Sequence, residues 1–145
     1  MPVDARHLAR ERALELLYEA DVKGVAPSEV VASLPVAPDA FVVTLVGDAQ
    51  AARDVAEAAI RAAAVDWPLE RMAVLDRLVM ILAIGEVLGA DPPPDAVILD
   101  EAVELAKAYS TEASPRFVNG VLAAVLPSLE RPVGPAAPAD GRPRG

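Results

Sequence analysis

Apolar residues recur three and four positions apart along most of the chain, and no stretch alternates strictly between apolar and polar residues. This spacing is typical of amphipathic helices rather than strands. It predicts a helix from Asp4 to about Val22, a short helix from Ser28 to Leu34 and a long helix from Asp39 to about Ala64. Gly24 stands where a left-handed residue commonly ends a helix.

The second half of the chain continues the helical pattern. The segment Ala73 to Leu88 is apolar on almost every side and therefore predicts a central, buried helix. After the proline run, Asp95 to Tyr109 is amphipathic, and Ser114 with Pro115 opens a last helix that runs to about Leu129. The whole pattern predicts an all-α fold. We expect one helical domain in residues 1–130 and a disordered tail, rich in Pro and Gly, in residues 131–145.

Composition and charge narrow the classes of function. The chain has 145 residues, 54% of them hydrophobic, so it can bury a substantial core. Its longest apolar run, Leu78 to Ile84, is far shorter than the roughly 20 residues of a membrane span. Without cysteine there are no disulfides, and we expect a cytoplasmic protein with no membrane segment. The net charge of −9 excludes nucleic-acid binding through the overall field, so any such binding needs a local basic patch.

Basic residues gather at the start of the first predicted helix, where Arg6, His7, Arg10 and Arg12 lie close together. Arg6 and Arg10 share the helix face that continues as Ala13, which is the face turned to the core. Because two buried, unpaired guanidinium groups are too costly, we expect this end to project past the core and to offer its arginines to an anion. The alternative is that they pair with carboxylates of the body or reach water.

The helix from Asp95 to Tyr109 carries an acidic face that includes Asp100, Glu101 and Glu104, with Lys107 as its only cation. A solvated outer face and a docking surface for a basic protein both explain this pattern, whereas catalysis or metal binding by these carboxylates is not favoured.

In the last helix, Gly120 costs about 1 kcal/mol relative to Ala. The pair Asn119-Gly120 therefore predicts a close approach by another helix, with Asn119 bonding a neighbouring backbone group.

Catalytic chemistry finds little support in the sequence. His7 is the only histidine, there is no cysteine, and no glycine-rich phosphate loop is present. We therefore expect a binding protein without a catalytic residue, a metal or a cofactor.

Three segments in fixed order, ARHLARERALELLYEADVKG, VLDRLVMILAIGEVL, and VILDEAVELAKAYSTEASPRF with the directly following VNGVL, resemble the NusB family of bacterial transcription antitermination factors. The resemblance spans roughly residues 4 to 126. It implies a compact bundle of about seven helices in two packed helical subdomains. It also implies pairing with the ribosomal protein NusE, and binding of the pair to the single-stranded boxA element of ribosomal RNA leader transcripts. In the transcription elongation complex, such a pair promotes read-through of terminators and ribosomal RNA maturation.

Carried over by position, the resemblance implies RNA contacts from Arg6, His7, Arg10, Ser114, Arg116 and Phe117. It implies NusE contacts from Glu86, Glu101 and Glu104. The sequence departs from the family pattern at Leu8, Ala113, Ile81 and Gly85. Leu8, an apolar residue within the basic cluster, leaves open a homodimer that covers this end.

Two other functions stay open. One is a helical adaptor that binds proteins and has no RNA affinity of its own. The other is a detached NusB-like module of a ribosomal RNA methyltransferase, which the lack of a cofactor-binding domain before Gly145 disfavours.

Overall fold

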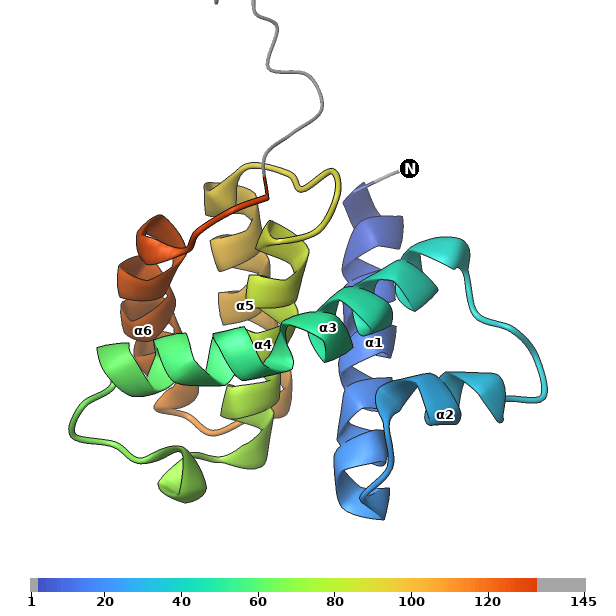
Figure 1. The fold of residues 1–145 in the computed structure, drawn as a ribbon, viewed down its shortest axis with the longest axis horizontal. Coiled ribbons are helices and arrows are strands. Elements are labelled where there is room, and N and C mark those ends of the chain that lie inside the picture. The colour runs from blue at the N-terminus through green and yellow to red at the C-terminus, as the bar shows by residue number, and fades with distance from the viewer. Residues whose placement is uncertain (1–2, 133–145) are drawn as a thin grey trace, which may run out of the picture.

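The computed structural model describes residues 3–132, and most of the predicted tail lies outside them. The described chain is helical throughout, which confirms the predicted all-α fold (Figure 1). In chain order its helices are α1 (Val3–Lys23), α2 (Pro27–Ala32), α3 (Ala40–Ala63), the 3-10 helix η1 (Leu69–Arg71), α4 (Val74–Val87), α5 (Asp95–Tyr109) and α6 (Ser114–Ser128).

Helix α3 connects two groups of helices. Its 24 residues make it roughly 36 Å long, at about 1.5 Å per residue. It packs against α1 and α2 on one side and against α4 and α6 on the other, and Figure 1 shows it crossing the molecule between these groups. The two groups are further joined where α1 contacts α4.

Helix α4 forms the centre of the core, as its apolar sequence predicted. Every residue from Leu78 to Val87 is buried. Gly85 lies where α4 meets α3, and a Cβ atom on it would stand 2.8 Å from the Cα atom of Ala49. Gly85 therefore permits a backbone approach that no larger residue would allow without a shift.

Gly120 does not have the role that the sequence predicted. A Cβ atom on Gly120 would meet nothing within 4 Å, and both Asn119 and Gly120 are exposed. The prediction of close packing at Gly120 is wrong because the core-facing stripe of α6 runs through Val118, Val121 and Leu122, whereas the Asn-Gly pair lies on the outer side.

Candidate nucleic-acid interface

Arg10 lies inside the molecule, between α1 and α4. Its side chain donates two hydrogen bonds to Glu86, from Nε to Oε1 at 2.9 Å and from Nη2 to Oε2 at 2.6 Å. A third, from Nη1, reaches Glu101 at 3.4 Å, and the guanidinium carbon stands 5.8 Å from the centre of the Phe41 ring. Only 4% of Arg10 is exposed. The expectation that Arg10 projects past the core is therefore wrong.

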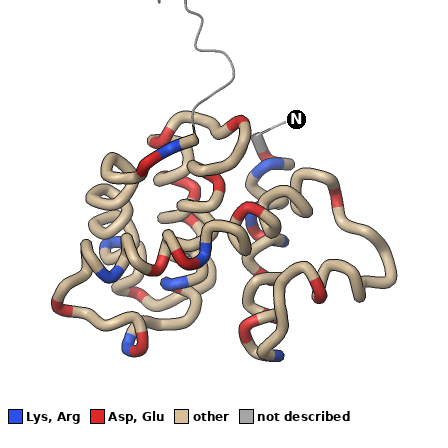
Figure 2. The backbone as a smooth tube through the Cα atoms, viewed as in Figure 1, with Lys and Arg blue, Asp and Glu red and all other residues tan. Residues whose placement is uncertain are grey.

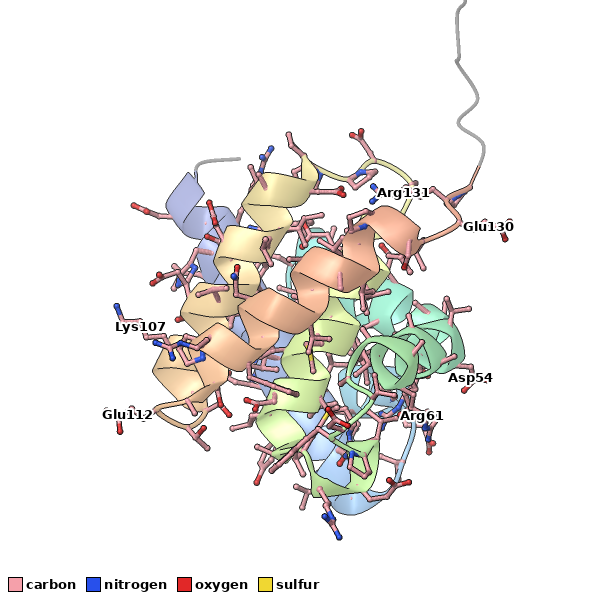
Figure 3. All side chains as sticks on the ribbon, turned by 90° about the vertical axis from the view of Figure 1, so that its left-hand side faces the viewer. Asp54, Arg61, Lys107, Glu112, Glu130 and Arg131 are labelled. Carbon is pink, nitrogen blue, oxygen red and sulfur yellow. The ribbon has the colours of Figure 1, made fainter. Side chains whose placement is uncertain are left out.

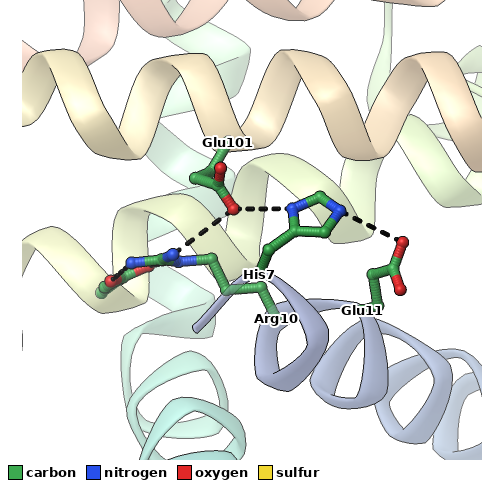
Figure 4. A network of polar contacts seen from close by, with 5 residues as sticks. His7, Arg10, Glu11 and Glu101 are labelled. Carbon is green, nitrogen blue, oxygen red and sulfur yellow. Dashed lines mark hydrogen bonds and ion pairs between the residues drawn. The ribbon is translucent and has the colours of Figure 1, made fainter. Parts of the chain in front are cut away.

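His7 joins the same set of charges from the outer side. Its Nδ1 atom lies 2.9 Å from Oε1 of Glu101, and its Nε2 atom lies 3.3 Å from Oε2 of Glu11 (Figure 4). We call the five residues His7, Arg10, Glu11, Glu86 and Glu101 the α1 ion cluster. The cluster connects α1 to α4 and α5, so this part of the basic sequence motif stabilises the fold.

The carboxylates of the α1 ion cluster favour the charged forms of its two basic groups. Burial opposes the charge on Arg10, but the hydrogen bonds and the charge of Glu86 outweigh it and keep the pKa of Arg10 above its ordinary value. For His7, the hydrogen bond to Glu101 is the largest influence and raises the pKa above 6.5, against a smaller opposing effect of burial. Both cations are thus matched to carboxylates of the same chain.

Two of the three expected partner contacts belong to this cluster. Glu86 is buried against Arg10, and Glu101 is shared by His7 and Arg10. Neither carboxylate is presented freely on the surface. Glu104 and Asp100 are exposed on α5 and keep the acidic face that the sequence predicted. Figure 3 shows Lys107 and Glu112 projecting into solvent at the far end of this helix.

Arg6 differs from Arg10 because its side chain is exposed. It lies at the rim of a cavity of about 480 Å³ that also reaches Phe41, Asp48 and Arg10. Burial, followed by the charge of Glu86, raises the pKa of Asp48. Within residues 3–132 the exposed Arg6 guanidinium makes no ion pair, so it is available to an anion. Figure 2 shows basic and acidic positions interspersed over the helices. Leu8, on the same helix, is 62% exposed, and a homodimer contact through it stays a prediction.

Ser114, like Arg10, is an expected RNA-binding residue that is buried in the structure. It is 1% exposed, and its hydroxyl donates to Ser110 Oγ at 3.0 Å and accepts from the Thr111 amide at 3.0 Å. Ser110 in turn donates to Asp76 on α4 at 2.6 Å. The expectation that Ser114 faces a ligand is therefore wrong, because its hydroxyl closes the turn between α5 and α6.

Arg116 and Phe117, on the first turn of α6, are the two expected RNA residues next to Ser114 that reach the surface. Arg116 is exposed and Phe117 is half-buried. Both border a groove of about 340 Å³ that runs between α6 and the turn after α3. The indole of Trp67 forms part of the same groove and is 50% exposed. We call it the aromatic groove. The sequence pattern did not single out Trp67 as a site residue, although a single Trp followed by Pro in a turn was the available signal.

Other classes of site find no support in the described part of the chain. Residues 3–132 contain no group of three or more His, Asp or Glu side chains arranged to hold a metal ion. None of the helices described is both long and apolar enough to cross a membrane.

The fold and the site together define a small helical binding protein with an exposed cation at the start of α1, an acidic face on α5 and a groove lined by aromatic rings. The chain belongs to the NusB family, whose model matches residues 7–127.

Known relatives agree with this family assignment over most of the chain. The transcription antitermination protein NusB of Acidothermus cellulolyticus is 45% identical over 125 residues, which cover 83% of this chain and 86% of the relative. The protein of the same name from Streptomyces griseus is 42% identical over 142 residues, covering 88% of this chain and 97% of the relative. These relatives are antitermination proteins.

A solved complex of the antitermination factors NusB and NusE with double-stranded RNA has the same fold. The match has a TM-score of 0.72 at 24% identity and covers 88% of this chain and all of the other, 100%. At this identity the match shows the helical architecture alone.

Proposed function

We propose that this chain is a transcription antitermination factor that binds the single-stranded boxA element of ribosomal RNA leader transcripts together with NusE. In this proposal the complex acts in the cytoplasm with the elongating RNA polymerase, promotes read-through of terminators and supports ribosomal RNA maturation, by binding and without catalysis. The observation that carries the proposal is the exposed Arg6 on an acidic body of net charge −9, in a chain of the NusB family.

The α1 ion cluster has a positioning role in this mechanism. By pairing with Glu86 and Glu101, Arg10 and His7 hold the first turns of α1 against α4 and α5. The neighbouring Arg6 is thereby held at the surface, where its guanidinium can contact a phosphate. Arg116 supplies a second exposed cation on α6. So few phosphate contacts predict weak binding by this chain alone.

NusE completes the proposed RNA track. A basic partner is attracted to the exposed carboxylates of α5, Asp100 and Glu104, and its binding offsets their repulsion of RNA. A protein of the same fold has been solved with NusE and RNA, which supports this assembly as a model for the present chain. Of the three carboxylates first assigned to the partner, Glu104 keeps that role in the proposal.

The test compares two single substitutions on α1. We expect Arg6→Ala to weaken binding of boxA RNA by the complex with NusE and to reduce the salt slope by about 1. Arg12→Ala removes the same charge from an exposed residue that pairs with Glu15, and it should leave both quantities nearly unchanged. Equal effects of the two substitutions would show that Arg6 makes no specific contact.

A protein-binding adaptor is the second candidate, and the exposed Asp100 and Glu104 favour it. It predicts that the chain binds NusE and that the pair binds boxA RNA no more tightly than NusE alone. Titrating labelled RNA with NusE, with and without this chain, separates the two functions.

A further inference from the structure

The aromatic groove presents apolar surface that the fold leaves uncovered. It lies between the outer side of α6 and the turn that follows α3, so its walls come from segments that are far apart in sequence. Figure 3 looks onto α6, with Arg61 marking the nearby end of α3. The half-exposed Trp67 ring is an apolar surface that the fold itself does not bury.

The backbone fixes the position of Trp67. Its amide donates to the carbonyl of Ala64 at 3.0 Å, and the preceding Ala64 amide donates to Ile60 at 2.8 Å. Pro68 follows and restricts the backbone of Trp67 to extended conformations. Leu69, at the start of η1, is then buried in the core. The backbone that carries the ring is therefore anchored on both sides, which reduces the loss of conformational entropy when a ligand binds.

Gly120 keeps the groove open. A Cβ atom at this position would meet no atom within 4 Å, so the absence of a side chain serves no packing contact in the protein. Gly120 nevertheless costs about 1 kcal/mol of helix propensity relative to Ala. Because this residue lines the groove beside Phe117, any larger side chain would occupy the space that a ligand needs.

The polar groups of the groove indicate which part of a ligand enters it. Arg116 borders the groove and makes no ion pair within the described residues, so it can meet a phosphate at the rim. Asp66 borders the groove as well, and its carboxylate repels a phosphate from the interior. Aromatic rings with one cation suit an unpaired nucleobase, which stacks on rings while its phosphate stays outside. The volume of about 340 Å³ is that of a small ligand site.

We propose that the aromatic groove binds one unpaired base of the RNA strand, which stacks against Trp67 and Phe117 while Arg116 contacts the adjacent phosphate. This inference rests on the proposed function, since it identifies a base-binding site for the same RNA. It makes Trp67 a residue of the RNA interface. It also explains why a glycine stands at position 120 in the middle of α6.

Trp67 is the only tryptophan of the chain, so its fluorescence reports on this groove directly. We expect boxA RNA to quench the fluorescence of Trp67 when it is added to the complex of this chain with NusE, after subtraction of the signal of NusE alone. Trp67→Ala should weaken RNA binding by about tenfold, as expected for the loss of one stacked base. Circular dichroism checks that this variant keeps its helices.

A second pair of variants blocks the groove without removing a ring. Gly120→Leu fills the groove and improves helix propensity, so it should weaken RNA binding without destabilising the protein. Ala123→Leu adds the same side chain to an exposed position of α6 outside the groove and should leave binding unchanged. An abasic nucleotide can then be placed at each position of the boxA RNA in turn. At one position it should lower the affinity of the unsubstituted protein for RNA but cause no further loss of affinity in Gly120→Leu.

The outcomes distinguish this inference from the proposed function. If the complex binds no boxA RNA by anisotropy of labelled RNA, the proposed function fails. If RNA binds with full affinity to Gly120→Leu and leaves Trp67 fluorescence unchanged, the groove proposal alone is overturned. Quenching by NusE without RNA, together with weaker NusE binding by Gly120→Leu, would show that a protein segment fills the groove and would also overturn it.

Discussion

The pair between Arg10 and Glu86 is bidentate and almost closed to solvent, with 5% and 7% of the two side chains exposed. Removing one partner leaves the other charge buried and unpaired. We expect Arg10→Ala to lower the free energy of unfolding by about 3–5 kcal/mol. Urea denaturation followed by circular dichroism measures this change.

Arg12→Ala is the matched control for that substitution. Arg12 lies on the same helix, but it is exposed and pairs with Glu15 at 3.2 Å. Exposed pairs contribute about 0–1 kcal/mol, so this variant should unfold close to the unsubstituted protein. An Arg10→Ala protein as stable as Arg12→Ala would contradict the structural role of the α1 ion cluster.

Substitution by alanine should change the free energy of unfolding in opposite directions at two glycines in helices. Gly120→Ala adds a methyl group in open space and should raise the free energy of unfolding by about 1 kcal/mol. Gly85→Ala places the same group 2.8 Å from backbone atoms of Ala49 and should lower it by about 1–3 kcal/mol through overpacking. Shifts of equal sign in urea denaturation would contradict this difference in packing.

At the residue scale, the sequence predicted the core-facing side of α1 correctly, but it misplaced Gly120 on α6 and did not predict the partners across helices. Its pattern placed Arg10 on the core-facing side of α1, and the structure confirms that position. The pattern did not predict that Glu86 is the partner of Arg10. Glu86 is 76 positions away and meets Arg10 only after α1 packs on α4. Periodicity therefore indicated which way Arg10 points without showing that its charge is paired. Trp67 was missed for a related reason, since its groove forms only when α6 packs beside α3.

At the scale of elements, proline and glycine made the helix ends predictable. The helix from Asp95 to Tyr109 begins and ends as predicted, directly after the three prolines. Gly24 has a φ of 68°, which confirms the left-handed residue expected after α1. No comparable signal predicted η1, because three residues are too few to show a period.

The link between α1 and α5 through His7 and Glu101 predicts a dependence of stability on pH. The pKa of His7 is raised in the folded state, chiefly by Glu101, so folding favours the protonated ring. The stability from this link is fully present below about 6.5, the unfolded pKa, and is lost as pH rises through the folded pKa. We therefore expect the urea midpoint to fall as pH rises from about 6.5 through the folded pKa of His7. Glu11, Glu101 and Arg10 are the charged groups that face the ring.

His7→Gln isolates this effect from other titrating groups. Glutamine can still bond Glu101 but does not titrate, so the variant should lose less stability over the same pH range. Asp48, whose pKa is raised by burial, is present in both proteins and cancels from the comparison. Parallel pH profiles of the two proteins would show that His7 does not link α1 to α5 through its charge.

At the scale of the whole molecule, helical periodicity alone did not predict how the helices are grouped. The two subdomains were inferred from the family resemblance, and α3 joins two such groups in the structure. The overall charge was predictable from composition. The distribution of the charge was not, because Glu101, which the sequence assigned to an outer face, pairs with His7 and Arg10 inside the α1 ion cluster.

The charge that remains on the outer face of α5 predicts how fast a basic partner associates. Asp100 and Glu104 are exposed, and their field adds to that of a chain with net charge −9. We expect Asp100→Asn with Glu104→Gln to slow association with NusE severalfold at low salt, because attraction steers the encounter. The difference should shrink as salt is raised, since screening shortens the reach of the field to about 10 Å at 0.1 M.

A second double variant separates local steering from net charge. Asp54→Asn with Glu70→Gln removes the same charge from exposed positions on α3 and η1. Figure 3 shows Asp54 away from α5. Stopped-flow association rates measured at several salt concentrations should fall more for the α5 variant than for this control. Equal slowing would mean that the partner responds to the total charge of the chain, and α5 would then lose its assignment as the docking face.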